Sequence, residues 1–142
     1  MNKDELQNYI YIETLLAQLY RQIAAVAPSS AERNAFLSFS QDASRNAEKL
    51  NQIYRDQFGT NFNPIVPETV LQGGYRELLN EILDLELAST NALRSHTYFQ
   101  NDLALNKTLR QIADDKLSNV IQLLAIFTNN NSTQIDQLKK EM

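Results

Sequence analysis

The stretch QDASRNAEKL at residues 41–50 has the spacing of an amphipathic helix, yet an asparagine stands on its apolar face. At helical spacing that face consists of Phe39, Ala43, Asn46, Leu50 and Ile53. A second stretch, DDKLSNVIQL at residues 114–123, has Asn119 at the matching place and Lys116 one turn before it. A buried polar group without a partner costs roughly 2–7 kcal/mol. The two stretches therefore predict a polar network inside a helical protein.

The composition fits a single domain. The chain has 142 residues, of which 43% are hydrophobic, enough for one sizeable core. Its 13 basic and 17 acidic residues give a formal charge of −4 without a dense block of one sign, so we expect neither nucleic acid nor a membrane surface as a partner. The absence of cysteine excludes disulfides, thiolate metal ligands and cysteine nucleophiles. With no apolar run long enough for a signal core or a membrane span, the expected location is the cytoplasm.

Helix start and stop signals divide the chain into four long helices. Only three glycines and three prolines occur, and strand patterns are absent. Pro28 should end the first helix, Ser29 with Glu32 is a capping-box signature for the second, and Gly59 should end that one. The helices are expected at about residues 3–27, 29–58, 75–99 and 102–128. The predicted fold class is all-α, an antiparallel four-helix bundle of two hairpins joined by a long crossover at 59–74.

The bundle is expected to occupy residues 1–128. Residues 129–142 begin with the polar sequence NNNST and are expected to form a linker with a short C-terminal helix or tail. The apolar side of that tail would consist of Ile135, Leu138 and Met142.

Each expected helix has a polar residue near the middle of its apolar face. Glu13 holds this place in the first helix, Asn46 in the second and Glu86 in the third. Lys116 holds it in the fourth, with Asn119 beside it. One offset relates the two halves, because 86 − 13 = 73 and 119 − 46 = 73. The sequence therefore predicts a duplicated helical hairpin with its polar residues at the centre.

At these residues the chain resembles the ferritin-like superfamily, specifically the small rubrerythrin-like proteins of spore-forming bacteria, some of which are described as spore coat proteins. Glu13 followed by Tyr20 matches the glutamate and tyrosine of the family's first helix, and Glu86 matches the glutamate of its third. Asp42 and Asp115 match the aspartates that open the family's two D-E-x-x-H motifs. The resemblance covers nearly the whole chain and implies a bundle whose four helices supply six ligands to two metal ions.

The chain departs from the family at the metal ligands. Where the family has E-x-x-H, this sequence has Ala43 with Asn46, and Lys116 with Asn119. An amide is a weak neutral donor, and an ammonium group cannot ligate a metal. We therefore expect no cofactor and no catalytic residues. In place of a metal site we expect a core polar network of Glu13, Asn46, Glu86, Lys116 and Asn119.

Lys116 is expected to replace the metals as the positive partner of Glu13 and Glu86, with the two asparagines completing the network. One lysine cannot neutralise two carboxylates, so we expect one glutamate to hold a proton at neutral pH. Tyr20 is expected to pack in the core with a hydrogen-bonded hydroxyl group. The single histidine, His96, is expected to be a plain surface residue.

These features favour a non-catalytic ferritin-like bundle, retained as a structural or binding protein, for which the resemblance suggests a spore or stress setting. One alternative is a divergent metal-binding oxidase or peroxidase that uses Glu13, Glu86 and Asp115 in an altered site. Another is a small-ligand carrier that uses the space left by Ala43 and the absent metals.

We also expect a homodimer. Members of the resembled family often pair through helix faces, and this sequence has apolar residues off the main apolar faces of its helices. They include Ile12, Leu37 and Leu87.

Overall fold

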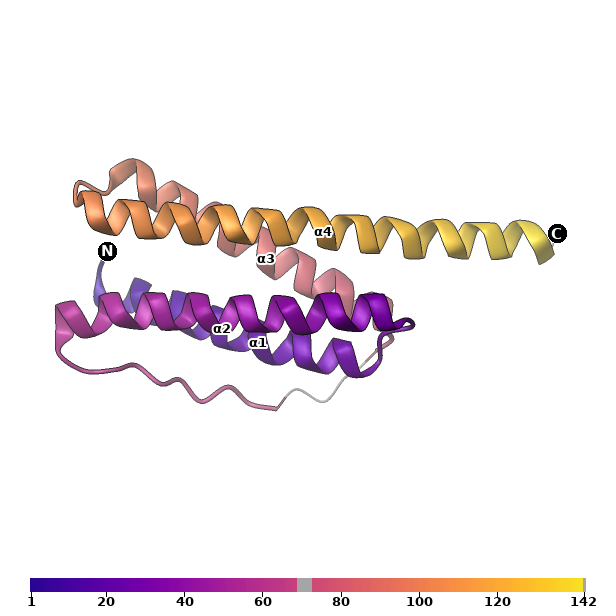
Figure 1. Cartoon of the computed structure of the whole chain (residues 1–142), viewed down its shortest axis with the longest axis horizontal. Helices are drawn as coiled ribbons and strands as arrows, with labels where there is room; N and C mark the ends of the chain where they lie inside the picture. Colours follow the sequence, from indigo (N-terminus) through magenta and orange to yellow (C-terminus); the bar gives the residue numbers. More distant parts are fainter. Residues whose placement is uncertain (69–72, 142) are drawn as a thin grey trace.

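The computed structural model describes the backbone of residues 1–68 and 73–141, and their side chains except those of 130–139 and 141. Four helices are present: α1 (Lys3–Ala25), α2 (Ser30–Phe58), α3 (Tyr75–Phe99) and α4 (Leu103–Glu141), as Figure 1 shows. One hairpin consists of α1 and α2 and the other of α3 and α4, and the hairpins meet where α1 packs on α3 and α2 packs on α4. The prediction of an all-α four-helix bundle is confirmed.

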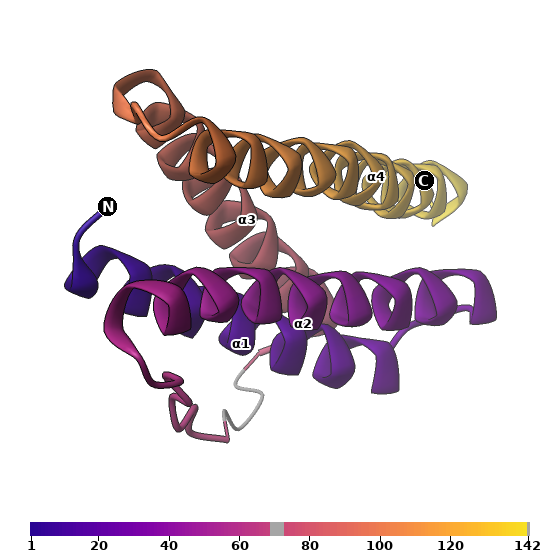
Figure 2. The ribbon, with the colours of Figure 1, turned by 60° about the vertical axis from the view of Figure 1, so that its left-hand side comes forward.

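The connection between α2 and α3 sets the direction of the second hairpin. It leads from one end of the bundle, where α2 ends, to the other end, where α3 begins (Figure 1). As a result α2 and α3 run in the same direction, while every pair of packed neighbours is antiparallel (Figures 1 and 2). The bundle is therefore antiparallel, and α4 extends beyond the other three helices.

Side chains of α1 and α2 hold the described part of this connection, residues 59–68. Asn51 Nδ2 donates to the Phe62 carbonyl at 2.8 Å, and its Oδ1 accepts from the Phe62 backbone N–H at 2.9 Å. Further along, Gln18 Nε2 donates to the Pro67 carbonyl at 3.0 Å. These bonds attach the connection to the outer side of the first hairpin.

The first two helices begin with local caps. Asn2 Oδ1 accepts from the Glu5 backbone N–H at 2.8 Å, and Glu5 Oε1 accepts from the Asn2 backbone N–H at 3.2 Å, a complete capping box. Ser29 Oγ accepts from the Glu32 backbone N–H at 3.1 Å, as predicted. The Glu32 carboxylate does not close that second box, because it accepts from the Tyr75 hydroxyl at 2.9 Å and so joins the starts of α2 and α3.

The ends of α2 and α1 lie at or near the glycine and proline that were expected to stop them. Gly59 ends α2 with φ 76°, a left-handed conformation that favours glycine. The first helix, α1, ends at Ala25, two residues earlier than expected and ahead of Pro28.

The end of α4 differs from the prediction. The helix was expected to stop near Thr128, but it continues to Glu141. The segment NNNST at 129–133 lowers helix propensity without supplying a glycine or proline that would stop the helix. The side chains of the predicted tail lie outside the described residues, namely those of Ile135, Leu138 and Met142.

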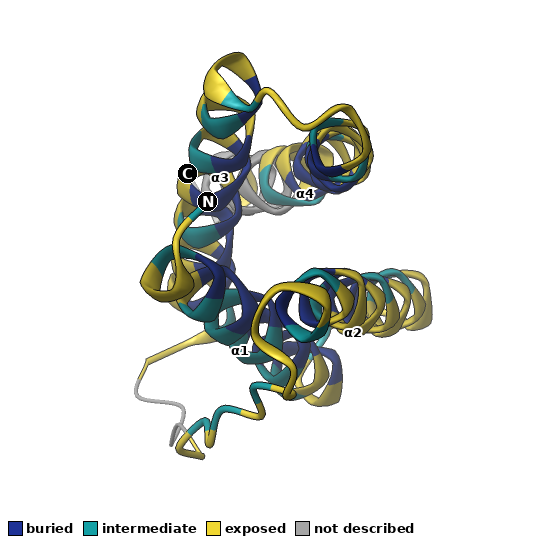
Figure 3. Cartoon of the chain, turned by 90° about the vertical axis from the view of Figure 1, so that its left-hand side faces the viewer, coloured by how far each residue is buried: buried dark blue, intermediate teal, exposed yellow. Residues whose placement is uncertain are grey.

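Two apolar clusters fill the bundle, one on each side of a polar layer. The cluster nearer the end of α1 contains, among others, Leu16, Tyr20, Phe36, Phe39, Leu79, Ile82, Val120 and Leu123. The cluster nearer the start of α1 contains, among others, Leu6, Ile10, Leu50, Tyr54, Leu93, Leu109 and Ile112. On each helix a buried polar residue stands between the clusters, namely Glu13, Asn46, Glu86 and Lys116. Ser89 and Thr90 of α3 and Asn119 of α4 are also buried there. The end-on view in Figure 3 shows the buried residues of every helix facing inward.

None of the helices, as far as the described residues extend, offers a stretch apolar and long enough to cross a membrane.

Candidate functional site

Lys116 of α4 places its ammonium group between two carboxylates at the bundle centre. Its Nζ donates to Glu13 Oε1 of α1 at 2.5 Å and to Glu86 Oε2 of α3 at 2.8 Å. All three side chains are only 1–2% exposed. The contact expected from the sequence is therefore present, and Lys116 joins three helices. We call Glu13, Lys116 and Glu86 the buried triad.

Glu86 has a partner on each carboxylate oxygen. Its Oε2 accepts from Lys116, and its Oε1 accepts from the Tyr20 hydroxyl group at 2.6 Å. Burial, followed by the negative charge of Glu86, raises the pKa of Tyr20 well above its ordinary value. Tyr20 therefore stays protonated as a donor, and the expectation of a core tyrosine with a hydrogen-bonded hydroxyl group is confirmed.

Glu13 has fewer hydrogen-bond partners than Glu86 among the described residues. Its Oε1 accepts from Lys116, but among the described residues its buried Oε2 has no hydrogen-bond partner. Burial raises the pKa of Glu13 to about 7, with Lys116 lowering it, Glu86 raising it and the Asn46 amide lowering it. Burial therefore favours the protonated form of Glu13.

Lys116 keeps its positive charge. Burial lowers the pKa of its ammonium group, but the charges and hydrogen bonds of Glu13 and Glu86 outweigh this effect and raise the pKa above its ordinary value. The buried triad therefore carries one net negative charge when both glutamates are ionised and no net charge when Glu13 holds a proton.

The two asparagines of the predicted network have different surroundings. Asn46 is buried in the polar layer and acts on the pKa of Glu13. Asn119 is also buried, but its Nδ2 donates to Asp42 Oδ2 of α2 at 3.3 Å instead of to a glutamate. Because α2 packs against α4, Asp42 lies within reach of Asn119, and Asp42 also pairs with the exposed Arg45. The expectation that Asn119 binds the core carboxylates is wrong.

Asp115, a residual metal candidate from the sequence, lies on the exposed side of α4 and does not join Glu13 and Glu86. In the part of the chain that the structure describes, no group of three or more His, Cys, Asp or Glu side chains is placed to hold a metal ion. The two core carboxylates bind the ammonium group of Lys116, which repels a cation and cannot ligate one. The residues present at the centre therefore do not fit a di-metal site.

His96 is more than a surface residue, which corrects the sequence expectation. Its Nε2 lies 2.8 Å from Glu5 Oε2, and its ring stands edge-on to Tyr9 with 5.5 Å between centroids. These contacts join the end of α3 to the start of α1. No local pattern announces them, because the residues are more than 85 positions apart and meet only through the α1 and α3 packing.

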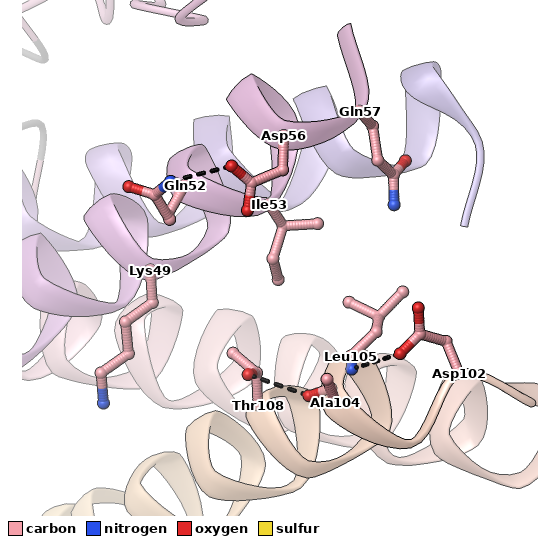
Figure 4. A pocket seen from close by; sticks show the side chains of 9 residues that line it. All are labelled: Lys49, Gln52, Ile53, Asp56, Gln57, Asp102, Ala104, Leu105 and Thr108. Atoms are coloured by element: carbon pink, nitrogen blue, oxygen red, sulfur yellow. Dashed lines mark hydrogen bonds between the residues drawn. The ribbon is translucent and has the colours of Figure 1, made fainter. Parts of the chain in front are cut away.

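A pocket of about 400 Å³ lies between α2 and α4, away from the buried triad. Figure 4 shows Ile53 of α2 and Leu105 of α4 pointing toward one another across it, with Lys49 and Asp102 farther apart along its length. Most of its lining side chains are exposed and polar. The carrier alternative placed its ligand at the vacated bundle centre, a position that the side chain of Lys116 occupies.

No protein-family model matches this chain, and no curated protein matches it. The fold and the site together define a four-helix all-α protein with a lysine buried between two glutamates.

Proposed function

We propose that this protein is a non-catalytic, ferritin-like helical bundle, retained as a structural or binding protein, in which Lys116 supplies the positive charge that metal ions supply elsewhere. The observation that carries this proposal is the position of Lys116 Nζ, 2.5 Å from Glu13 Oε1 and 2.8 Å from Glu86 Oε2. In the ferritin-like proteins that the sequence resembles, glutamates at these places ligate metal. Here the same carboxylates bind a cation that belongs to the chain. The resemblance makes a spore or stress setting the first to examine.

The donor set and its burial support a non-catalytic role for the buried triad. Metal-ion catalysis requires ligands with free lone pairs and an open coordination position. Each member of the buried triad is at most 2% exposed, and the ammonium group of Lys116 offers no lone pair. Tyr20, the nearby hydroxyl, is bound to Glu86 with a raised pKa and has no role as an acid at neutral pH.

A structural role is consistent with the way the buried triad connects the helices. Lys116 joins α4 to α1 and α3, so any packing that rotates one of these helices outward leaves a charge buried without its partner. An unpaired buried charge costs several kcal/mol. The buried triad therefore favours one arrangement of the bundle over its competitors.

Metal analysis of matched proteins tests the proposal. The parent and a restored variant with Ala43→Glu, Asn46→His, Lys116→Glu and Asn119→His are each incubated with Fe²⁺, Mn²⁺ or Zn²⁺, desalted and analysed for bound metal. We expect the parent to hold far less than one ion per chain, and the restored variant, which carries the family's E-x-x-H residues, to bind metal. Near-stoichiometric metal in the parent would overturn the proposal in favour of an altered carboxylate site.

A further inference from the structure

The second hairpin has an outer groove between its helices. Arg94 of α3 and Arg110 and Asp114 of α4 line it, and Arg94 pairs with Asp114 at 3.2 Å. Residues two helical turns apart lie on the same face of a helix. The residue seven positions before Arg94 and the residues seven positions after Arg110 and Asp114 therefore lie farther along the same face of the hairpin.

Two turns along, the groove becomes apolar. Leu87 precedes Arg94 by seven residues, and Ile121 follows Asp114 by seven. By the same spacing Leu117 follows Arg110, and Leu124 follows Leu117. Leu87 is 36% exposed, Ile121 60% and Leu124 43%, which is unusual for large apolar side chains on one surface. We call Leu87, Leu117, Ile121 and Leu124 the α3–α4 patch.

The equivalent face of the first hairpin is polar. The offset of 73 residues places the α3–α4 patch on Thr14, Ser44, Glu48 and Asn51. The connection after α2 lies over that face, held by Asn51 and Gln18. Figures 1 and 3 show this connection on the side of the first hairpin that faces away from α3 and α4. Among the described residues, the outer face of the first hairpin is thus polar and contacts the connection, whereas the matched face of the second hairpin has exposed apolar side chains.

We propose that the α3–α4 patch is the centre of a homodimer interface and that the same patch of a second copy covers it. Such a face can close a twofold pair, because each copy offers the surface that the other needs. The face is also large enough. With 25 residues, α3 is about 37 Å long, and two helices are about 20 Å wide, giving roughly 700 Å². Specific interfaces bury about 600–1,000 Å² on each partner, a range that includes this footprint.

The length of α4 supports the same twofold arrangement. α4 has 39 residues and projects beyond the other helices (Figure 1). Ile121 is the nineteenth residue of α4, so it stands at the middle of the helix. A twofold axis at Ile121 pairs α4 with its copy in antiparallel fashion.

The mass in solution provides the first test. Light scattering coupled to gel filtration, at tens of micromolar chain, should give the parent twice the chain mass of 16.2 kDa. The patch variant Leu87→Thr, Ile121→Glu and Leu124→Asn carries the residues of the first hairpin at the matched positions, and it should elute with the single-chain mass and an unchanged helical circular dichroism spectrum. The control Ile65→Ser, which removes a 91% exposed apolar side chain elsewhere, should remain a dimer. A parent of single-chain mass, or a dimeric patch variant, overturns the proposal.

Cross-linking provides a second test that does not depend on how the patch variant folds. Because the chain has no cysteine, Ile121→Cys introduces a single thiol near the proposed axis. Mild oxidation should convert most of this variant to a disulfide-linked pair. Glu48→Cys, the matched position on the first hairpin, should remain a single chain. Equal cross-linking of the two variants would contradict the proposal. The outcome is independent of the metal analysis, because the α3–α4 patch shares no residue with the buried triad.

Discussion

Tyr20 and Leu93 occupy equivalent positions in the two hairpins, and their different side chains give the two core glutamates different surroundings. The positions are related by 93 − 20 = 73, and both side chains are fully buried. The Tyr20 hydroxyl donates to Glu86, whereas leucine has no donor to offer at the matched place beside Glu13. Glu13 Oε2 has no hydrogen bond among the described residues, and burial raises the pKa of Glu13. A nearly symmetric fold thus has an asymmetric charge network.

Replacing Lys116 by alanine should strongly destabilise the bundle. Removing one partner of a buried ion pair typically costs about 3–5 kcal/mol, because the other charge remains buried. Denaturant unfolding at neutral pH measures the loss, and it should shrink as the pH falls, since the carboxylates of Glu13 and Glu86 can then bind protons. Lys107→Ala removes an exposed lysine from the same helix and should change the free energy of unfolding by less than about 0.5 kcal/mol. A Lys116→Ala protein as stable as the parent would show that the ammonium group lies in solvent.

Neutralising the whole triad should cost much less than removing the lysine alone. The variant Glu13→Gln, Glu86→Gln, Lys116→Met keeps similar shapes and leaves no unpaired charge in the core. Its free energy of unfolding, measured beside that of Lys116→Ala, should lie closer to the parent value. If the triple variant is the less stable of the two, packing rather than charge determines the stability of this layer.

Tyr20→Phe should lower stability through loss of a single hydrogen bond. The Tyr20 hydroxyl donates to Glu86 Oε1 at 2.6 Å in a fully buried site, and hydrogen bonds to charged groups contribute about 1.5–3 kcal/mol. The matched control is Tyr98→Phe, because Tyr98 is 79% exposed and its hydroxyl group is not part of the buried network. Chemical unfolding of both variants should show a loss for Tyr20→Phe only. Equal stability of the two would mean that Glu86 finds another donor.

The raised pKa of Glu13 makes stability depend on pH in a defined direction. Its pKa is about 7 in the folded protein and 4.5 in the reference state, so between these values the folded protein holds a proton that the unfolded chain releases. The stability from this group is therefore fully present below pH 4.5 and is lost as the pH rises through 7, by about 3 kcal/mol at most. Relative to Glu13→Gln, which does not titrate, the parent should lose stability from about pH 5 to about pH 8. A pH-independent difference between the two proteins would show that this carboxyl group titrates normally.

Much of the fold could be predicted from local signals. Glycine and proline positions and apolar spacing predicted four helices, and Gly59 ends α2 in the left-handed conformation as expected. The same spacing placed Glu13, Glu86 and Lys116 on inward faces, because helical periodicity determines which side of a helix is buried. Opposite charges on inward faces require one another in a core that excludes water. The contacts between Lys116 and both glutamates were therefore predictable from the sequence.

Other features were decided by the tertiary structure. Asn119 contacts Asp42, and His96 contacts Glu5, because packing sets the relative rotation and register of helices that are far apart in sequence. The periodicity of one helix carries no information about which neighbour its side chains meet. The exposure of the α3–α4 patch has the same origin, since it depends on which hairpin the connection after α2 lies over. The sequence determined which faces of the helices are polar or apolar, and only the packing of the two hairpins decided which of those faces are covered.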